Sequence, residues 1–119
     1  MALVLHSKNQ TLVVRADGEL DLVSAQKFRE MVDRAIEEMA GTNLIINLSK
    51  VTFIDSSGLG VILGRYRMIK AKNGVLVLCG VNKNVNRVLE MSGLLSFMQV
   101  CEHENAAWEI IKDRAVRGA

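Results

Sequence analysis

One stretch of this 119-residue chain, VTFIDSSGLGVIL at positions 51–63, holds residue types and spacings that could do chemistry. An apolar run ends at Asp55, two serines follow, and glycines then recur in a segment with helical periodicity. Three kinds of chemistry fit such a turn: a serine nucleophile, a cradle for a phosphate group, or a serine that another protein phosphorylates. The simplest alternative is that Ser56 or Ser57 only caps the following helix. Capping needs one serine and does not require the aspartate, the second serine and the glycine beside it.

A hydrolytic nucleophile finds no support in the rest of the sequence. A serine hydrolase needs a base within hydrogen-bonding reach and a third group that orients this base. The two histidines are His6, in an expected edge strand, and His103, in a polar loop. The G-x-S-x-G elbow is also absent, because the two serines are adjacent. We therefore expect no catalytic residue and no enzymatic activity.

The glycines come close to a nucleotide-binding pattern without matching it. Gly58, Gly60 and Gly64 form G-x-G-x-x-x-G, in which the third glycine comes one residue too late for the dinucleotide fingerprint. No Asp or Glu occurs between Tyr66 and Asn86 to bind a ribose. Close helix packing, or room for a partner's backbone, explains the glycines better, and we expect no cofactor. A nucleotide or phosphate bound at the serine turn stays open as the alternative function.

A phosphorylated serine in this turn is compatible with a folded domain. A phosphate on Ser56 would lie at a helix N-terminus, where backbone amides and the helix dipole favour negative charge. It would add close to two negative charges beside Asp55 and the acidic segment 19–21. A docking partner would then meet concentrated charge in place of a neutral hydroxyl. Residue chemistry alone does not choose between Ser56 and Ser57.

The helix after the turn offers a second feature for docking. Val61, Arg65 and Met68 fall in line with Ser57 and Gly60, on a different face from the residues expected in the core. An apolar–basic–apolar stripe that leads away from the serine turn indicates a protein contact. The alternative is that Val61 and Met68 lie under a neighbouring helix.

Alternating strand and helix patterns must position the turn. Strands are expected at residues 3–6, 11–16, 43–48, 51–54, 75–80 and 97–101, and helices at residues 24–41, 56–70, 84–92 and 106–115. An acidic loop, residues 17–21, is expected to end the second strand. This order predicts an α/β fold with parallel central strands and an antiparallel hairpin at the N-terminal edge. The serine turn then lies at the carboxyl ends of the parallel strands, where ligands and partners meet such sheets.

Composition narrows the class of protein. A formal net charge of +2, 4% aromatic residues and no basic cluster argue against nucleic-acid binding. The longest apolar runs are too short to span a membrane, and no signal-peptide pattern begins the chain, so we expect a cytoplasmic protein. Cys79 and Cys101 could pair in principle, but reduced core residues are expected in this compartment.

Three motifs carry a resemblance to a known family. GELD (residues 18–21), FIDSSGLGVILGRY (53–66) and MSGL (91–94) resemble the sporulation-type anti-sigma factor antagonists of the STAS domain family. The likeness covers essentially the whole chain in order. It implies a single STAS domain over residues 1–119, an α/β fold with a mixed, mostly parallel central sheet of four to five strands and about four helices.

The resemblance also implies a partner-switching regulator of transcription. Such proteins bind an anti-sigma factor that is also a serine kinase, and so free a sigma factor. Phosphorylation of the first serine of the turn abolishes this binding, and a serine phosphatase restores it. By position the phosphoacceptor is Ser56. The expected partner-binding residues are Asp21, Asp55, Ser56, Ser57, Gly58, Gly60, Val61 and Arg65, and no metal site is expected.

Overall fold

The computed structural model of the chain describes residues 1–39 and 41–117, and these form a sheet covered by helices on both faces. The strands are β1 (Ala2–Lys8), β2 (Thr11–Leu20), β3 (Asn43–Ile54), β4 (Leu76–Cys79) and β5 (Gln99–Cys101). The helices are α1 (Leu22–Glu38), α2 (Ser56–Ala71), α3 (Lys83–Met91) and α4 (Glu104–Arg117), with a short 3₁₀ helix, η1, over Leu94–Ser96. The strand order is β1-β2-β3-β4-β5, with β1 antiparallel to β2 and every other pair parallel. The predicted mixed, mostly parallel α/β sheet is confirmed.

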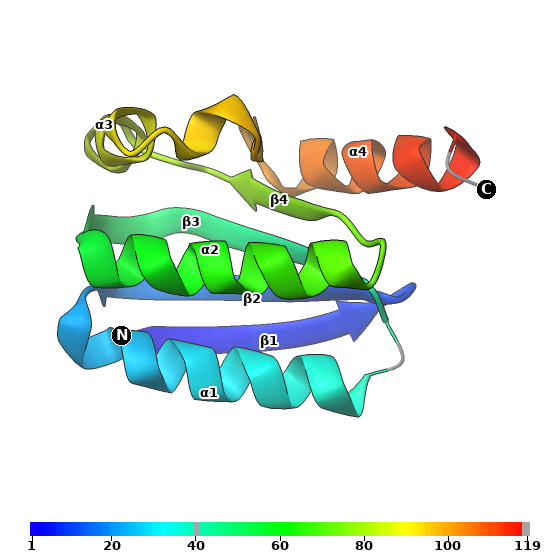
Figure 1. Cartoon of the computed structure of the whole chain (residues 1–119), viewed down its shortest axis with the longest axis horizontal. Coiled ribbons are helices and arrows are strands. Elements are labelled where there is room, and N and C mark those ends of the chain that lie inside the picture. Colours follow the sequence, from blue (N-terminus) through cyan, green and yellow to red (C-terminus); the bar gives the residue numbers. More distant parts are fainter. Residues whose placement is uncertain (40, 118–119) are drawn as a thin grey trace.

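Alternation along the central strands builds one core on each face of the sheet. In β3, Leu44 and Ile46 belong to the larger core, which α1, α2 and α3 cover, whereas Ile45 belongs to the smaller core, which α4 covers with Ala107 and Ile111. Figure 1 shows α1 and α2 side by side across the sheet. Burial on both faces explains why the NLIINL segment is apolar at every position except its two asparagines.

The strands β2 and β3 are longer than the sequence predicted. The expected acidic loop over residues 17–21 does not interrupt β2, which continues to Leu20, and the two strands expected at 43–48 and 51–54 are one strand. The polar residues of segment 17–19 remain paired with β3 because the register shifts twice, once directly after Gly18. The backbone of Gly18 has φ +118°, a conformation that favours glycine. The pairing ends with Leu20 opposite Ile54, so both strands stop at the same edge.

Smaller differences lie at the ends of elements. The helix α1 starts at Leu22, two residues earlier than expected, because Asp21 caps it. The last strand starts at Gln99 instead of residue 97, because the chain turns through η1 after Gly93, whose φ is +84°. The strands β4 and β5 place Cys79 opposite Cys101, and both thiols are free. Within the described part of the chain, no helix has the length and apolar character that a membrane span requires.

One polar cluster ties α4 to the sheet. Arg15 of β2 donates from Nε and Nη2 to the two carboxylate oxygens of Glu104, at 2.7 and 2.8 Å. Asn47 of β3 donates to Glu104 Oε2 at 2.7 Å. The hydrogen bond from Arg15 is the main cause that lowers the pKa of Glu104 to about 2. The first residue of α4 is thus bound to two neighbouring strands at once.

Replacing Glu104 with Gln should destabilise the protein in a pH-dependent manner. The folded-state pKa lies below the usual 4.5, so the contribution is complete above that pH and is lost as the pH falls toward about 2. The side chain of Arg15 is half-exposed, so solvent screens the pair and we expect a loss of about 1 kcal/mol at pH 7. Urea unfolding at a series of pH values measures this free energy.

Glu109→Gln, at an exposed position of the same helix, is the matched control and should change stability little at any pH. A difference between wild type and E104Q that stayed constant down to pH 2 would contradict the role given to this carboxylate.

Candidate partner-binding site

The site forms where β2 and β3 end together. Leu20 and Ile54 are register neighbours, and the amide of Asp55 donates to the carbonyl of Leu20 at 3.3 Å. Asp21 and Asp55 each follow directly and begin α1 and α2. The predicted acidic residues and the two serines therefore share one edge of the sheet, at the left of Figure 1.

Asp55 is the N-cap of α2. Its Oδ1 accepts hydrogen bonds from the amides of Ser57 and Gly58, at 2.9 and 3.1 Å. The alternative that Ser56 or Ser57 is the cap is therefore wrong, and Ser56 is the first residue inside the helix. A free phosphate at this turn would need the same amides, so the aspartate competes with that alternative.

Asp21 plays the same part for α1. Its carboxylate accepts from the amide of Ser24 at 3.0 Å, and the hydroxyl of Ser24 accepts from the amide of Asp21 at 2.9 Å, which completes a capping box. The same hydroxyl donates to the carbonyl of Glu19 at 2.7 Å. The hydrogen bond from the Ser24 amide is the main cause that lowers the pKa of Asp21. Two capping aspartates thus lie side by side at the start of neighbouring helices.

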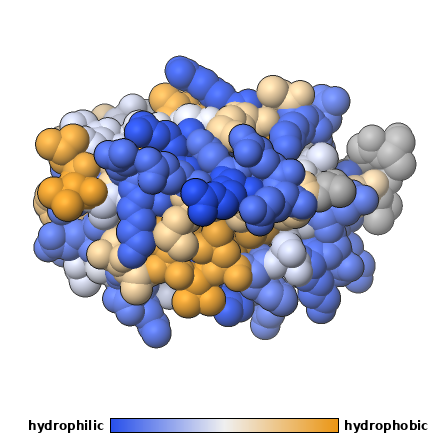
Figure 2. Space-filling model, turned by 90° about the horizontal axis from the view of Figure 1, so that it is seen from below, coloured by the Kyte–Doolittle hydropathy of each residue, from blue (hydrophilic) through white to orange (hydrophobic). Residues whose placement is uncertain are grey.

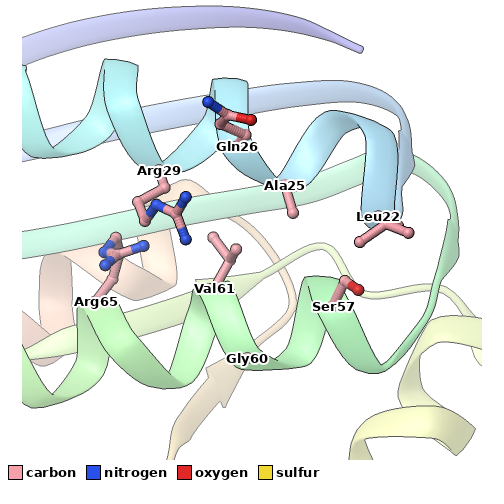
Figure 3. A pocket seen from close by; sticks show the side chains of 8 residues that line it. All are labelled: Leu22, Ala25, Gln26, Arg29, Ser57, Gly60, Val61 and Arg65. Atoms are coloured by element: carbon pink, nitrogen blue, oxygen red, sulfur yellow. The ribbon is translucent and has the colours of Figure 1, made fainter.

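The two serines have different surroundings. Ser56 is exposed, whereas Ser57 is half-buried and lines a cleft between α1 and α2 (Figure 3). Among the described residues, neither hydroxyl has a hydrogen-bond partner, because the caps are aspartates. The structure therefore distinguishes the two hydroxyls by their exposure, which residue chemistry alone could not do.

The glycines of α2 also fall into two classes. A Cβ on Gly58 would lie 2.4 Å from the carbonyl oxygen of Leu20 and 2.7 Å from Ile54 Cγ1, so α2 can pack on the strand ends only with glycine there. A Cβ on Gly60 or Gly64 would meet no atom within 4 Å. Of the two predicted reasons for these glycines, close packing applies to Gly58. Open space at Gly60 leaves room for a partner.

The expected exposed stripe on α2 is not at the surface. Val61 and Arg65 are only 6% and 7% exposed, and Met68 is half-buried against the core. The covering element is α1, whose Asp33 lies 3.0 Å from Arg65 Nε. The prediction of an outward face is therefore wrong for Val61 and Arg65, and the alternative of a covering helix is confirmed for Val61. Both residues line the α1–α2 cleft.

Sequence reasoning missed an exposed apolar group at the same edge. The side chains of Leu22, Val23 and Phe53 are 74%, 87% and 48% exposed. Figure 2 shows hydrophobic surface at the left end of the molecule, where α1 begins. The available signal was the pair of apolar residues directly after GELD, which belong to the first turn of the helix. Within the described residues, no group of three or more His, Cys, Asp or Glu side chains could hold a metal ion.

Comparison with known proteins decides the family. The sequence profile of the STAS domain matches residues 2–107. The chain belongs to the STAS domain family. This STAS domain is 43% identical over 100 residues to the anti-sigma F factor antagonist of Paenibacillus polymyxa. The matched region covers 83% of this chain and 86% of that protein. It is 33% identical to the anti-sigma-B factor antagonist of Bacillus subtilis, with 73% and 78% of the two chains covered.

Solved structures agree with the sequence relatives. The anti-sigma factor antagonist SpoIIAA in its unphosphorylated form has a TM-score of 0.72 at 29% identity, with 93% of this chain and 98% of that chain covered. The Bacillus cell fate determinant SpoIIAA in the phosphorylated form has a TM-score of 0.72 at 33% identity, with 92% and 99% covered. The resemblance inferred from GELD, the serine turn and MSGL is confirmed.

The two glycine classes predict opposite effects of the same substitution. Gly58→Ala should destabilise the STAS domain by about 2 kcal/mol or more, because the new methyl group meets the backbone of Leu20. Gly60→Ala should be neutral or stabilise by up to about 1 kcal/mol, because alanine is the better helix former and the space is open. Urea unfolding of both variants measures the difference. Equal stabilities would mean that α2 does not depend on close approach at Gly58.

Proposed function

We propose that this STAS domain is an anti-sigma factor antagonist that works by partner switching. The unphosphorylated form binds an anti-sigma factor and so frees a sigma factor for transcription, and phosphorylation of Ser56 ends the binding. Support comes from the curated relatives, which are named antagonists of anti-sigma F and anti-sigma-B factors. Further support comes from SpoIIAA, which has been solved in unphosphorylated and phosphorylated forms.

The observation that carries the proposal is the free, exposed hydroxyl of Ser56 on the first residue of a 16-residue helix. Asp55 performs the capping, so modification of Ser56 removes no hydrogen bond that the fold uses. The hydroxyl of Ser57 lies in the cleft beside α1, where a kinase active site has less access. We therefore assign the phosphate to Ser56 and a supporting contact to Ser57.

The capped turn also accounts for how the phosphate would act. It adds close to two negative charges next to the Asp55 carboxylate. The amides of Ser57 and Gly58 already donate to Asp55, so they are not free to neutralise the phosphate. A partner that docks here would have to desolvate this charge or pair with it. Binding is lost, while the helix and its cap keep their hydrogen bonds.

The proposed partner surface surrounds Ser56 and combines polar and apolar groups. Its outer contacts are Asp21, Leu22, Val23, Phe53, Asp55, Ser56, Ser57 and Gly60. Gly58, Val61 and Arg65 support this surface from beneath, since all three are buried. The absence of a side chain at Gly60 lets a partner's backbone approach α2 closely.

The proposed cycle needs two other proteins and no catalysis by this chain. The anti-sigma factor itself acts as the serine kinase, and a separate serine phosphatase restores the binding form. We also propose that the domain continues past residue 107 through α4, because Ile111 is buried in the smaller core.

Phosphosite mapping tests the assignment. The chain is incubated with ATP and its anti-sigma factor, and the products are analysed by tandem mass spectrometry. We expect one phosphoryl group on Ser56 in wild type and in Ser57→Ala, and none in Ser56→Ala. Modification confined to Ser57 would overturn the assignment. Tight binding to the anti-sigma factor without any phosphorylation would mean that the turn serves only as a docking surface.

Substitution at Ser56 tests the charge mechanism. Ser56→Ala should bind the anti-sigma factor and resist switching, whereas Ser56→Asp should bind at least about tenfold more weakly, because added charge at a docked surface is costly. Ser56→Asn, of similar size without the charge, should bind far better than Ser56→Asp. All three should melt near wild type, as measured by circular dichroism. A Ser56→Asp protein without native circular dichroism would refute a local effect of charge.

A further inference from the structure

The cleft between α1 and α2 has a volume of about 410 Å³ and is lined by four polar side chains, of which Arg29 and Gln26 have no part in the proposed switch. Arg29 and Gln26 come from α1, and Ser57 and Arg65 come from α2. Figure 3 shows the guanidinium groups of Arg29 and Arg65 extending toward each other across the cleft. Ser56 is not part of the lining.

Arg65 is the unusual member of this set. It is 7% exposed, whereas Arg29, the other charged residue of the lining, is exposed. Its Nε lies 3.0 Å from Asp33 Oδ1, yet the geometry is not that of a hydrogen bond, and within the described residues neither Nε nor Nη1 has an acceptor. Asp33 Oδ1 is also without a hydrogen bond, so the ion pair supplies charge but no directed acceptor, and buried donors in this state are costly.

Arg29 places a second positive charge near Arg65. Burial is the main cause that lowers the pKa of Arg65, and the nearby charge of Arg29 lowers it further, against the opposite effect of Asp33. Two guanidinium groups thus lie close enough to repel each other, and the ion pair with Asp33 is made by Arg65. An anion in the cleft would relieve the repulsion, and the planar guanidinium matches the oxygen spacing of phosphate or carboxylate groups.

We propose that the α1–α2 cleft is a binding site for an oxyanion of phosphate type, with Arg29 and Arg65 as its main ligands and Ser57 and Gln26 as further donors. The volume is within the range of small-molecule sites, so it also accommodates the remainder of a small phosphomonoester. This site differs from the phosphorylated turn: it takes a free ligand, it lies between two helices, and it does not depend on the proposed function.

A titration of the unphosphorylated chain with inorganic phosphate tests the site, with no partner protein present. Amide signals are followed by NMR at constant ionic strength, with chloride as the reference salt. We expect saturable shifts at Ser57, Gly60 and Arg29. Arg29→Gln should weaken binding about tenfold, because a charge-assisted contact is lost. Arg67→Gln, an exposed arginine of α2 outside the lining, is the matched control and should change affinity less than about twofold.

Arg29 is exposed and its positive charge repels that of Arg65, so the Arg29→Gln protein should fold normally. The NMR spectrum of the ligand-free variant checks this. Glycerol phosphate is titrated in parallel: tighter binding than phosphate indicates a phosphomonoester ligand, and equal binding indicates the free ion. No saturable shift with either probe, shifts confined to the Asp55 turn, or equal affinity in Arg29→Gln would overturn the proposal. None of these results bears on switching at Ser56, because no partner is present.

Discussion

The parallel pairing of β2 with β3, maintained as far as Leu20 and Ile54, is the constraint on which the rest of the structure depends. Because both strands stop at one edge, the aspartates that follow them begin two helices side by side. The start of α2 then rests directly on the carbonyl of Leu20, which excludes any side chain at Gly58. The position of the serine turn is therefore set by the strand register together with Gly58, which lets α2 approach the strand ends.

Within that frame, the turn divides its tasks among adjacent residues. Asp55 holds the helix, Gly58 permits the packing, and Ser56 is left with no structural duty. A residue without such a duty can be modified or substituted while the domain stays folded. A similar division of roles is found at α1. Asp21 and Ser24 cap this helix, and Leu22 and Val23 stay exposed beside the turn.

Much of the fold could be predicted from the sequence, because the buried strands are continuous apolar runs and α1 has a clear apolar stripe. The extension of β2 could not, since the polar DGE segment joins a strand only when β3 supplies a register with two shifts. The choice of Asp55 as cap was also out of reach, because serine and aspartate have similar capping tendencies. Periodicity likewise placed Val61 and Arg65 on a common face but could not decide between a surface stripe and burial under a neighbouring helix, which α1 provides.

The hydrogen bond between Asp55 and Leu20 joins segments that are far apart in the chain. The turn is not held at the edge of the sheet until β2 and β3 have paired, so a short peptide containing the turn lacks the register that positions it. Any enzyme that recognises the turn by shape thus distinguishes native molecules from nascent or damaged ones. An enzyme that recognises the serine in this way acts on the folded protein in preference to the unfolded chain.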